Sequence, residues 1–163
     1  MKRNILTLII AVFALMQAAA QTYDNLWKQA DIIARKDQPR SEIGVMKKII
    51  SKASAAKDYG QLLAAEMRQM ILWKEISADS LTPNVERMEA EVLKVKDPAL
   101  KAVRYAVLGK VYSDMDEKKS QEFFKKALEQ PELLAKHTST EYVPLTLKGV
   151  DGSSFNNDLL HLI

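Results

Sequence analysis

The chain has 163 residues, of which 47% are hydrophobic and 28% charged, a composition typical of one globular domain rather than of a disordered segment. Five glycines and five prolines are too few for a turn-rich β-sandwich or barrel. The net charge is only +3, and Lys2 and Arg3 account for two of these charges, so nucleic acid is not an expected partner. Without any cysteine, the chain excludes a disulfide framework, a Cys-ligated zinc, a thiol nucleophile and a lipid-anchor cysteine.

The first twenty residues have the parts of a secretory signal peptide. A cationic start is followed by a mainly apolar run at residues 5–16, and residues 18–20 are the small alanines that a signal peptidase requires. An uncleaved membrane anchor is the alternative. A spanning helix needs roughly 20 apolar residues, however, and this run is interrupted at Gln17. We therefore predict that residues 1–20 are a cleaved signal peptide and that the mature chain is exported, either periplasmic or associated with the cell envelope.

The spacing of apolar residues after the signal first predicts three helices. One begins at an Asp24 cap and ends near Lys36, because Pro39 disfavours helical geometry in the residue before it. The next follows a Ser41 cap, and the third covers residues 59–76. Apolar side chains spread over more than half of the third helix, so we expect it to be sandwiched between neighbours. The apolar positions are Leu26, Trp27, Ala30, Ile33, Ala34, then Ile43, Met46, Ile49, Ile50, Ala53, then Leu62, Leu63, Met67, Met70, Ile71 and Trp73.

Three further helices are predicted before Pro131. The fourth is expected to start at the Thr-Pro pair 82–83, a hydroxyl cap followed by a proline in the first helical position, after a loop at residues 77–81. The Asp-Pro pair 97–98 gives the fifth helix the same start. The sixth follows a polar turn at residues 113–118. Their apolar positions are Val85, Met88, Val92, Val95, then Leu100, Val103, Val107, Leu108, Val111, then Phe123, Phe124, Ala127 and Leu128.

Six helices with short connections predict antiparallel packing, either in a bundle or in a solenoid of helix pairs. Residues 101–131 favour the solenoid, since small and aromatic residues stand there at tetratricopeptide spacings. These residues are Leu108, Gly109, Tyr112, Ser120, Phe124 and Ala127. The earlier helix pairs match that pattern less well, so a generic bundle stays open. We expect an all-α antiparallel array over residues 21–137, with Phe124 buried between helices and its replacement by Ala costing about 3–5 kcal/mol.

Residues 138–163 differ in character and are expected to be a linker that leads into a further element. Residues 142–147 form a short β-prone run, and the glycines after it predict a turn. A new helix is expected from Asn156 or Asn157. The apolar residues 158–163 would continue this helix, and they end without a C-cap. We therefore expect the chain to be the N-terminal piece of a longer protein, interrupted in mid-helix.

The sequence predicts no catalytic, cofactor-binding or metal-binding residue. His137 and His161 are the only histidines, and neither has a second histidine or a carboxylate at metal spacing. We interpret His137 as a surface residue and His161 as an interface residue. Asp151, Ser153 and Ser154 could form a triad with His161 on paper, but no nucleophile-elbow motif surrounds the serines, and turn chemistry explains them better. Phosphate-loop and dinucleotide-binding motifs are absent from the sequence.

The remaining charged and aromatic residues are explained as ordinary surface and core. Acidic side chains of the fourth helix are interpreted as a solvated face, and lysines of the sixth as the exposed side of an amphipathic helix that could contact an acidic partner. These residues are Glu86, Glu89, Glu91, Lys118, Lys119, Lys125 and Lys126. Trp27, Trp73 and the methionines are interpreted as core. A peptide-binding groove on the concave side of the array stays open as an alternative.

Four stretches carry a family resemblance: TYDNLWKQAD, YGQLLAAEM, AVRYAVLGKVY and, most specific, the tail EYVPLTLKGVDGSSFNNDLLHLI. Through them the chain resembles the N-terminal region of large bacterial alpha-2-macroglobulin-like proteins. Members of that family are long exported chains of many β-sandwich domains that are thought to trap proteases, often through a Cys–Gln thioester and a bait region. The resemblance implies a helical front end without the thioester, because the chain has no Cys. No functional residue of the family falls on a position of this chain.

Two functions of different classes follow from these observations. The first is a non-enzymatic helical structural or interaction module of an exported protease-trap-type protein. Its partners would be other domains of the same longer chain, with proteases and envelope proteins as further candidates. The alternative is a stand-alone periplasmic tetratricopeptide-like adaptor that binds peptides or an envelope protein. An enzyme comes third, and neither nucleic acid nor a membrane span after signal cleavage is expected.

Overall fold

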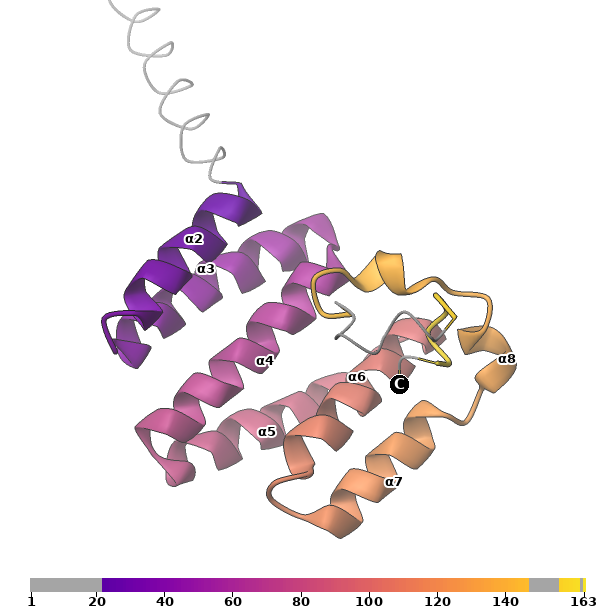
Figure 1. Ribbon diagram of the computed structural model, residues 1–163. Helices are drawn as coiled ribbons and strands as arrows, with labels where there is room; N and C mark the ends of the chain where they lie inside the picture. The colour runs from indigo at the N-terminus through magenta and orange to yellow at the C-terminus, as the bar shows by residue number, and fades with distance from the viewer. Residues whose placement is uncertain (1–21, 147–155, 162) are drawn as a thin grey trace, which may run out of the picture.

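The computed structural model describes residues 22–146, 156–161 and 163, and over these residues the protein is helical and contains no strand beyond one isolated bridge (Figure 1). In chain order the elements are α2 (Tyr23–Ala34), α3 (Pro39–Ala56), α4 (Tyr59–Ile76), α5 (Ala78–Val92), α6 (Pro98–Tyr112), α7 (Glu117–Ala127), α8 (Pro131–Leu134) and the 3-10 helix η1 (Ser139–Tyr142). The expected signal peptide lies outside the described residues. Within them, no helix combines the length and the apolar character that a membrane crossing requires.

The long helices pack side by side in chain order and reverse direction at each connection (Figure 1). This arrangement confirms the predicted all-α antiparallel array. α4 contacts α3, α5, α6 and η1, which confirms that the third predicted helix is sandwiched between neighbours. α5 follows α4 and precedes α6 in the chain, and it runs in the opposite direction to both. α4 and α6 therefore point in the same direction, and they also contact each other.

Side-chain caps explain where several helices begin. Asp58 caps α4 and Asp97 caps α6, each accepting a hydrogen bond from the backbone N–H three residues later. The predicted bounds of the third helix and the predicted start of the fifth are therefore confirmed. α2 begins slightly earlier than predicted, because its cap is the hydroxyl of Thr22 and not the carboxylate of Asp24.

Two other helices also begin before their predicted caps. α3 begins at Pro39 rather than after Ser41, since a proline in the first helical position gives up no helical hydrogen bond. α5 begins at Ala78, so the expected loop at residues 77–81 is instead part of the helix. The Thr-Pro pair at 82–83 is thus inside a helix and not at its start.

Local and tertiary contacts explain why α5 continues through Pro83. A proline inside a helix lacks the N–H that would bond to the carbonyl four residues earlier. Beside it, the Asn84 amide donates a hydrogen bond to the carbonyl of Ser80 at 2.9 Å. Leu81 in the same turn is buried against α4 and α6. Burial of this leucine offsets part of the cost of the proline, a contribution that local propensity does not include.

The core consists of three apolar clusters that follow the array from end to end. One lies between α2, α3 and α4, the second between α4, α5 and α6, and the third between α4, α6 and the C-terminal segment. Their most deeply buried members include Leu26, Met46, Ile49, then Val85, Val92, Leu108, then Leu63, Leu134 and Leu159. Most of the apolar positions predicted from the sequence are buried, but Ile71 on α4 and Leu128 after α7 are 46% and 41% exposed.

The α6–α7 hairpin has the close helix crossing that its small residues predict. A Cβ placed on Gly109 would lie 2.9 Å from the ring of Phe124, so the missing side chain lets the two helices approach. The hydroxyl of Ser120 donates a hydrogen bond to the carbonyl of Gly109 at 2.8 Å, and Ala127 is buried. Phe124 itself is only half-buried, contrary to prediction, because its ring packs against Gly109 and also lines a surface hollow.

The C-terminal segment differs from its prediction in secondary structure. Residues 139–146 form η1 and a turn in place of the expected β-prone extended run, whose last residue lies outside the described part. Residues 156–161 form turns and not the expected helix. An antiparallel bridge joins Thr138 to Asp158. The segment is therefore closed by contacts between its own two ends, a pairing that the hydrophobic pattern of either end does not reveal.

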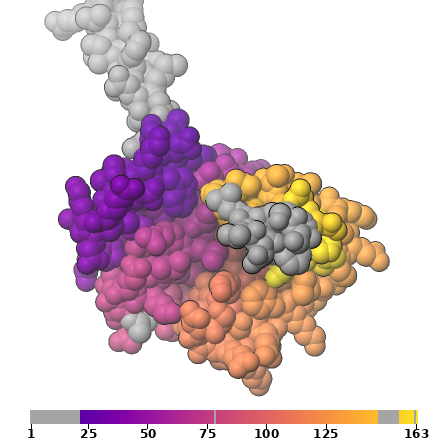
Figure 2. Space-filling model, viewed as in Figure 1, coloured from indigo at the N-terminus to yellow at the C-terminus, as the bar shows by residue number. Residues whose placement is uncertain are grey.

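The same segment packs onto the helices, and in the space-filling view its light orange and yellow residues lie against the body of the molecule (Figure 2). Tyr142 and Leu159 are 4% and 1% exposed and belong to the same cluster as Leu63 of α4. A Cβ on Gly60 would lie 2.7 Å from the carbonyl carbon of Val143. The first turn of α4 thus accepts the backbone of this segment at a distance that only glycine allows.

Candidate binding groove

Each histidine pairs with a carboxylate three or four residues away in the sequence. The Nδ1 of His137 is 2.9 Å from a carboxylate oxygen of Glu141, and the Nδ1 of His161 is 2.7 Å from Asp158. The hydrogen bond to each histidine holds the pKa of its carboxyl partner below the usual value. In the described part of the chain, no three His, Cys, Asp or Glu side chains are grouped to hold a metal ion. The other members of the triad considered from the sequence, Asp151, Ser153 and Ser154, lie outside the described residues.

Ion pairs connect helices that pack against each other. Arg68 on α4 forms a two-pronged pair with Glu42 on α3, with N–O distances of 2.6 and 3.2 Å. Arg104 on α6 lies 3.3 Å from Glu66 on α4, and both side chains are nearly buried. Burial raises the pKa of Glu66, and the positive charge of Arg104 acts in the opposite direction. These charges are explained by helix-to-helix contact.

The acidic face predicted on α5 is only partly solvated. Glu86 is exposed, as predicted, whereas Glu89 and Glu91 are half-buried. Glu91 forms an ion pair within α5, and Glu89 accepts hydrogen bonds from Lys119 at 3.3 Å and from the hydroxyl of Tyr112. Glu89 therefore connects α5 to the α6–α7 hairpin.

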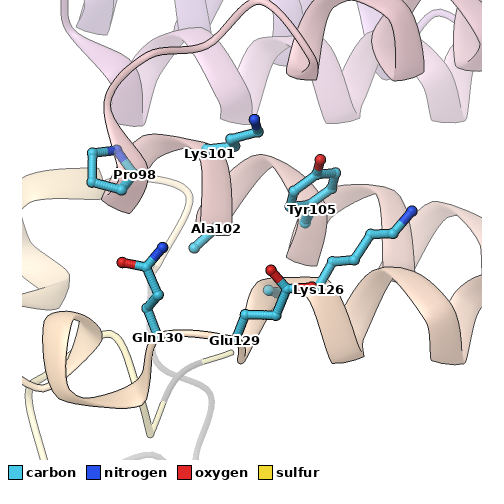
Figure 3. Close-up of a pocket in the computed structure, with 8 residues that line it drawn as sticks. Pro98, Lys101, Ala102, Tyr105, Lys126, Glu129 and Gln130 are labelled. Carbon is cyan, nitrogen blue, oxygen red and sulfur yellow. The ribbon is translucent and has the colours of Figure 1, made fainter.

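A shallow hollow of about 230 Å³ lies between the start of α6 and the end of α7 (Figure 3). Lys101, Tyr105 and Lys126 contribute to its lining. The ammonium of Lys126 is 5.8 Å from the ring centre of Tyr105 and 5.3 Å from that of Phe123, so aromatic rings engage part of its charge. We interpret this hollow as an ordinary surface depression beside the exposed lysines that the sequence predicts on α7.

A longer depression, the α4–α6 groove, follows the two parallel helices and consists of two adjoining hollows of about 300 and 260 Å³. Met67 and Lys110 line both hollows and so mark where they join. The first hollow is otherwise lined by Val103, Ala106, Val107, Phe124, Leu145, Thr146, Leu159 and Ile163. The second is otherwise lined by Met70, Ile71, Lys74, Leu81, Val111 and Asp114.

The chemistry of the groove suits apolar side chains. Its lining is mainly aliphatic with two methionines, whose flexible thioethers adapt to differently shaped partners. Lys74 and Asp114 form an exposed ion pair of 3.2 Å at one end. Lys110 is exposed, and no ion pair involves it within the described residues. The groove therefore offers two apolar hollows with a cation between them.

The sequence pattern places seven of the sixteen lining residues in the core and the others in loops, in the linker or on no predicted face, so it does not locate the groove. Met67, Met70 and Ile71 were counted among the apolar positions of a sandwiched helix. The signal that could have found the groove is the width of that apolar surface, because α4 carries more apolar positions than its neighbours cover. The peptide-binding groove on a concave side, which the sequence leaves open as an alternative, stays a prediction.

Comparisons with protein-family models, with curated proteins and with solved structures each find no match to this chain.

Proposed function

We propose that this chain is a non-enzymatic helical scaffold and interaction module of an exported protein of the alpha-2-macroglobulin-like type that its sequence resembles. The observation that carries the proposal is the α4–α6 groove. The pairs Arg68–Glu42 and Arg104–Glu66 each join two packed helices, which supports a structural role for these charges. The groove, in contrast, leaves apolar surface such as Ile71 open to solvent, and apolar surface gathered in a groove is typical of a binding site.

A self-contained adaptor that binds peptides or an envelope protein is the second candidate. Its specific support is the C-terminal segment, because Tyr142 and Leu159 pack back onto α4 and α6. Both candidates use the same groove and differ in whether the gene continues. An in-frame coding sequence with β-sandwich patterning after Ile163 favours the first candidate, and a stop codon there favours the second.

Site-specific cross-linking tests the groove as the interaction surface. The chain has no cysteine, so Ile71→Cys introduces a single thiol to which a photoactivated cross-linker can be attached. Ile32→Cys on α2 is the matched control, since Ile32 is 54% exposed and lies away from the groove. In cells that export the protein, we expect an adduct of defined mass at position 71 and none at position 32. Equal labelling at both positions, or none at position 71, would contradict the proposal.

Export is tested separately by N-terminal sequencing of the mature protein. We expect the sequence to begin near Gln21, after the alanines at residues 18–20. A mature chain that still begins with Met1 would exclude the cleaved signal peptide. This result would leave the groove proposal unaffected, because that proposal depends on the folded helices and the C-terminal segment packed on them.

A further inference from the structure

We infer that the α4–α6 groove binds an amphipathic helix of a partner protein, whose apolar stripe fills the two hollows and whose carboxylate pairs with Lys110. This inference rests on the proposed function, since it specifies the partner of the same groove.

The first step concerns the shape of the groove. Met67 and Lys110 border both hollows, so one continuous ligand can occupy the two together. The hollows extend from Val103 on α6 to Asp114, just beyond the end of that helix, which makes the groove elongated along α6. An elongated apolar groove takes a segment of chain rather than a single compact side chain.

The second step concerns the backbone of the ligand. Each peptide N–H and C=O that leaves water needs a hydrogen-bond partner, or the complex loses free energy. The lining offers few such partners: Lys74 and Asp114 bond to each other, and the hydroxyl of Thr146 donates to the carbonyl of Ser139 at 2.5 Å. The described part of the groove also has no strand edge that could pair with an extended peptide. A helix satisfies its own backbone, so a helical ligand fits this lining better than an extended one.

The third step concerns spacing. The middles of the two hollows are separated by roughly five residues of α6, which at 1.5 Å per residue is about 8 Å. On a docked helix, apolar residues at i, i+4 and i+7 lie on one face and extend over about 10 Å. Such a stripe reaches from one hollow into the other. The side chain in the middle of the stripe would then lie over Met67.

The fourth step concerns charge. Lys110 stands at the junction of the hollows, is exposed, and has no ion pair among the described residues. A carboxylate on the edge of the ligand's apolar stripe would meet its ammonium group. A basic residue in that place would be repelled. The groove is therefore complementary to an amphipathic helix with an Asp or Glu beside the central apolar residue.

Selection from a display library of random 15-residue peptides tests the inference on the intact chain. We expect the enriched sequences to share apolar residues at i, i+4 and i+7 with an acidic residue near the middle. Against Lys110→Glu, the same library should enrich Lys or Arg at that position. Lys101→Glu is the matched control, because residue 101 is nine positions earlier on α6 and so on its opposite face, and the acidic preference should be unchanged.

The affinity of the best peptide gives a quantitative check by fluorescence anisotropy. We expect Lys110→Glu to weaken binding at least tenfold, and exchange of the acidic residue for Lys in the peptide to restore it. Lys110→Gln, which removes the charge without reversing it, should abolish the acidic preference without creating a basic one. Circular dichroism of the variants establishes that each is folded.

Three results would overturn the inference: no enrichment, an enriched motif without helical spacing, or an acidic preference that Lys110→Glu leaves intact. If any of these occurs while Ile71→Cys still gives its specific adduct, the groove binds a partner of another kind and the proposed function stands. If position 71 gives no adduct in cells, the proposed function fails even where peptides bind in vitro.

Discussion

The α6–α7 hairpin and the docked C-terminal segment both depend on a glycine, and the two glycines have different neighbours. Opposite Gly109 lies the ring of Phe124, a side chain from the helix that follows directly in the chain. Opposite Gly60 lies the backbone of Tyr142 and Val143, more than eighty residues away in sequence. A ring can rotate or shift within its site, whereas a backbone moves only if the whole segment moves. The first contact is therefore local and tolerant, and the second is long-range and rigid.

The largest effect is expected where the C-terminal segment enters the core. Leu159→Ala should lower the free energy of unfolding by about 3 kcal/mol, within the range for buried leucines, because the side chain is 1% exposed. Urea unfolding followed by circular dichroism measures the change. Leu128→Ala is the control, since Leu128 is 41% exposed and a surface substitution usually changes stability by less than about 0.5 kcal/mol. Equal effects at the two positions would mean that the segment does not contribute to the core.

The same substitution at the two glycines compares the contacts directly. Gly60→Ala should cost about 2 kcal/mol, since its Cβ meets a backbone that has to move away. Gly109→Ala should cost about 1 kcal/mol or less, because the ring of Phe124 can yield and alanine in mid-helix regains about 1 kcal/mol of helix propensity. Thermal unfolding measures both changes. The reverse order of the two would contradict the distinction between a backbone and a side-chain neighbour.

Removal of the Phe124 ring tests its contact with Gly109 in the α6–α7 hairpin. Phe124→Ala should cost roughly 2 kcal/mol, less than the 3–5 kcal/mol of a fully buried phenylalanine, because the ring is half-buried. With the ring gone, Gly109→Ala should become neutral or stabilising, so the double mutant measures the coupling between the two sites. If Gly109→Ala costs the same in both backgrounds, the two residues do not restrict each other.

The smallest effect is expected when the pH is lowered. Low pH should weaken the C-terminal segment before it weakens the α6–α7 hairpin. Hydrogen bonds to His137 and His161 lower the pKa of Glu141 and of Asp158 in the folded chain. Carboxyl groups with a lowered pKa stabilise the fold above their usual pKa of about 4, and this contribution is lost as pH falls through the folded value. Below about pH 4, the amide of Leu159 should therefore lose protection against hydrogen exchange, measured relative to the intrinsic exchange rate at each pH, before the amides of α7 do.

Glu141→Gln is the matched variant for this experiment. Because glutamine does not titrate, the acid-dependent loss of protection at Leu159 should be smaller in the variant than in the unmodified chain. Simultaneous loss of protection in α7 and at Leu159 would show that acid acts on the whole array and not on the C-terminal segment.

The parts of the fold that were predictable from sequence are those held by contacts close in the chain. The cap at Asp97, the bounds of α4 and the small residues of the α6–α7 hairpin all have local signals. The local signal for the start of α5 is misleading, because the Thr-Pro pair at 82–83 has the pattern of a helix start. The helix begins earlier, at Ala78, and Leu81 in its first turn is buried. Propensity is a weak preference that tertiary packing overrides.

The C-terminal segment and the groove were not predictable for a shared reason. The bridge from Thr138 to Asp158 and the fit of Val143 against Gly60 join residues far apart, and no periodic pattern encodes such pairs. The groove includes the part of the apolar surface of α4 that neither the neighbouring helices nor this segment buries. Its existence therefore depends on the arrangement of elements, although Met67 and Ile71 were recognised as apolar positions of a helix.

The shared direction of α4 and α6 has a consequence for how a helix would lie between them. Each helix carries a dipole with a partial negative charge at its C-terminal end, and both of these ends lie near Lys74 and Asp114. A guest helix that points its positive N-terminal end toward them brings opposite partial charges together, which is favourable. We therefore expect the groove to select the polarity of its partner as well as its apolar stripe, with the guest helix antiparallel to α4 and α6.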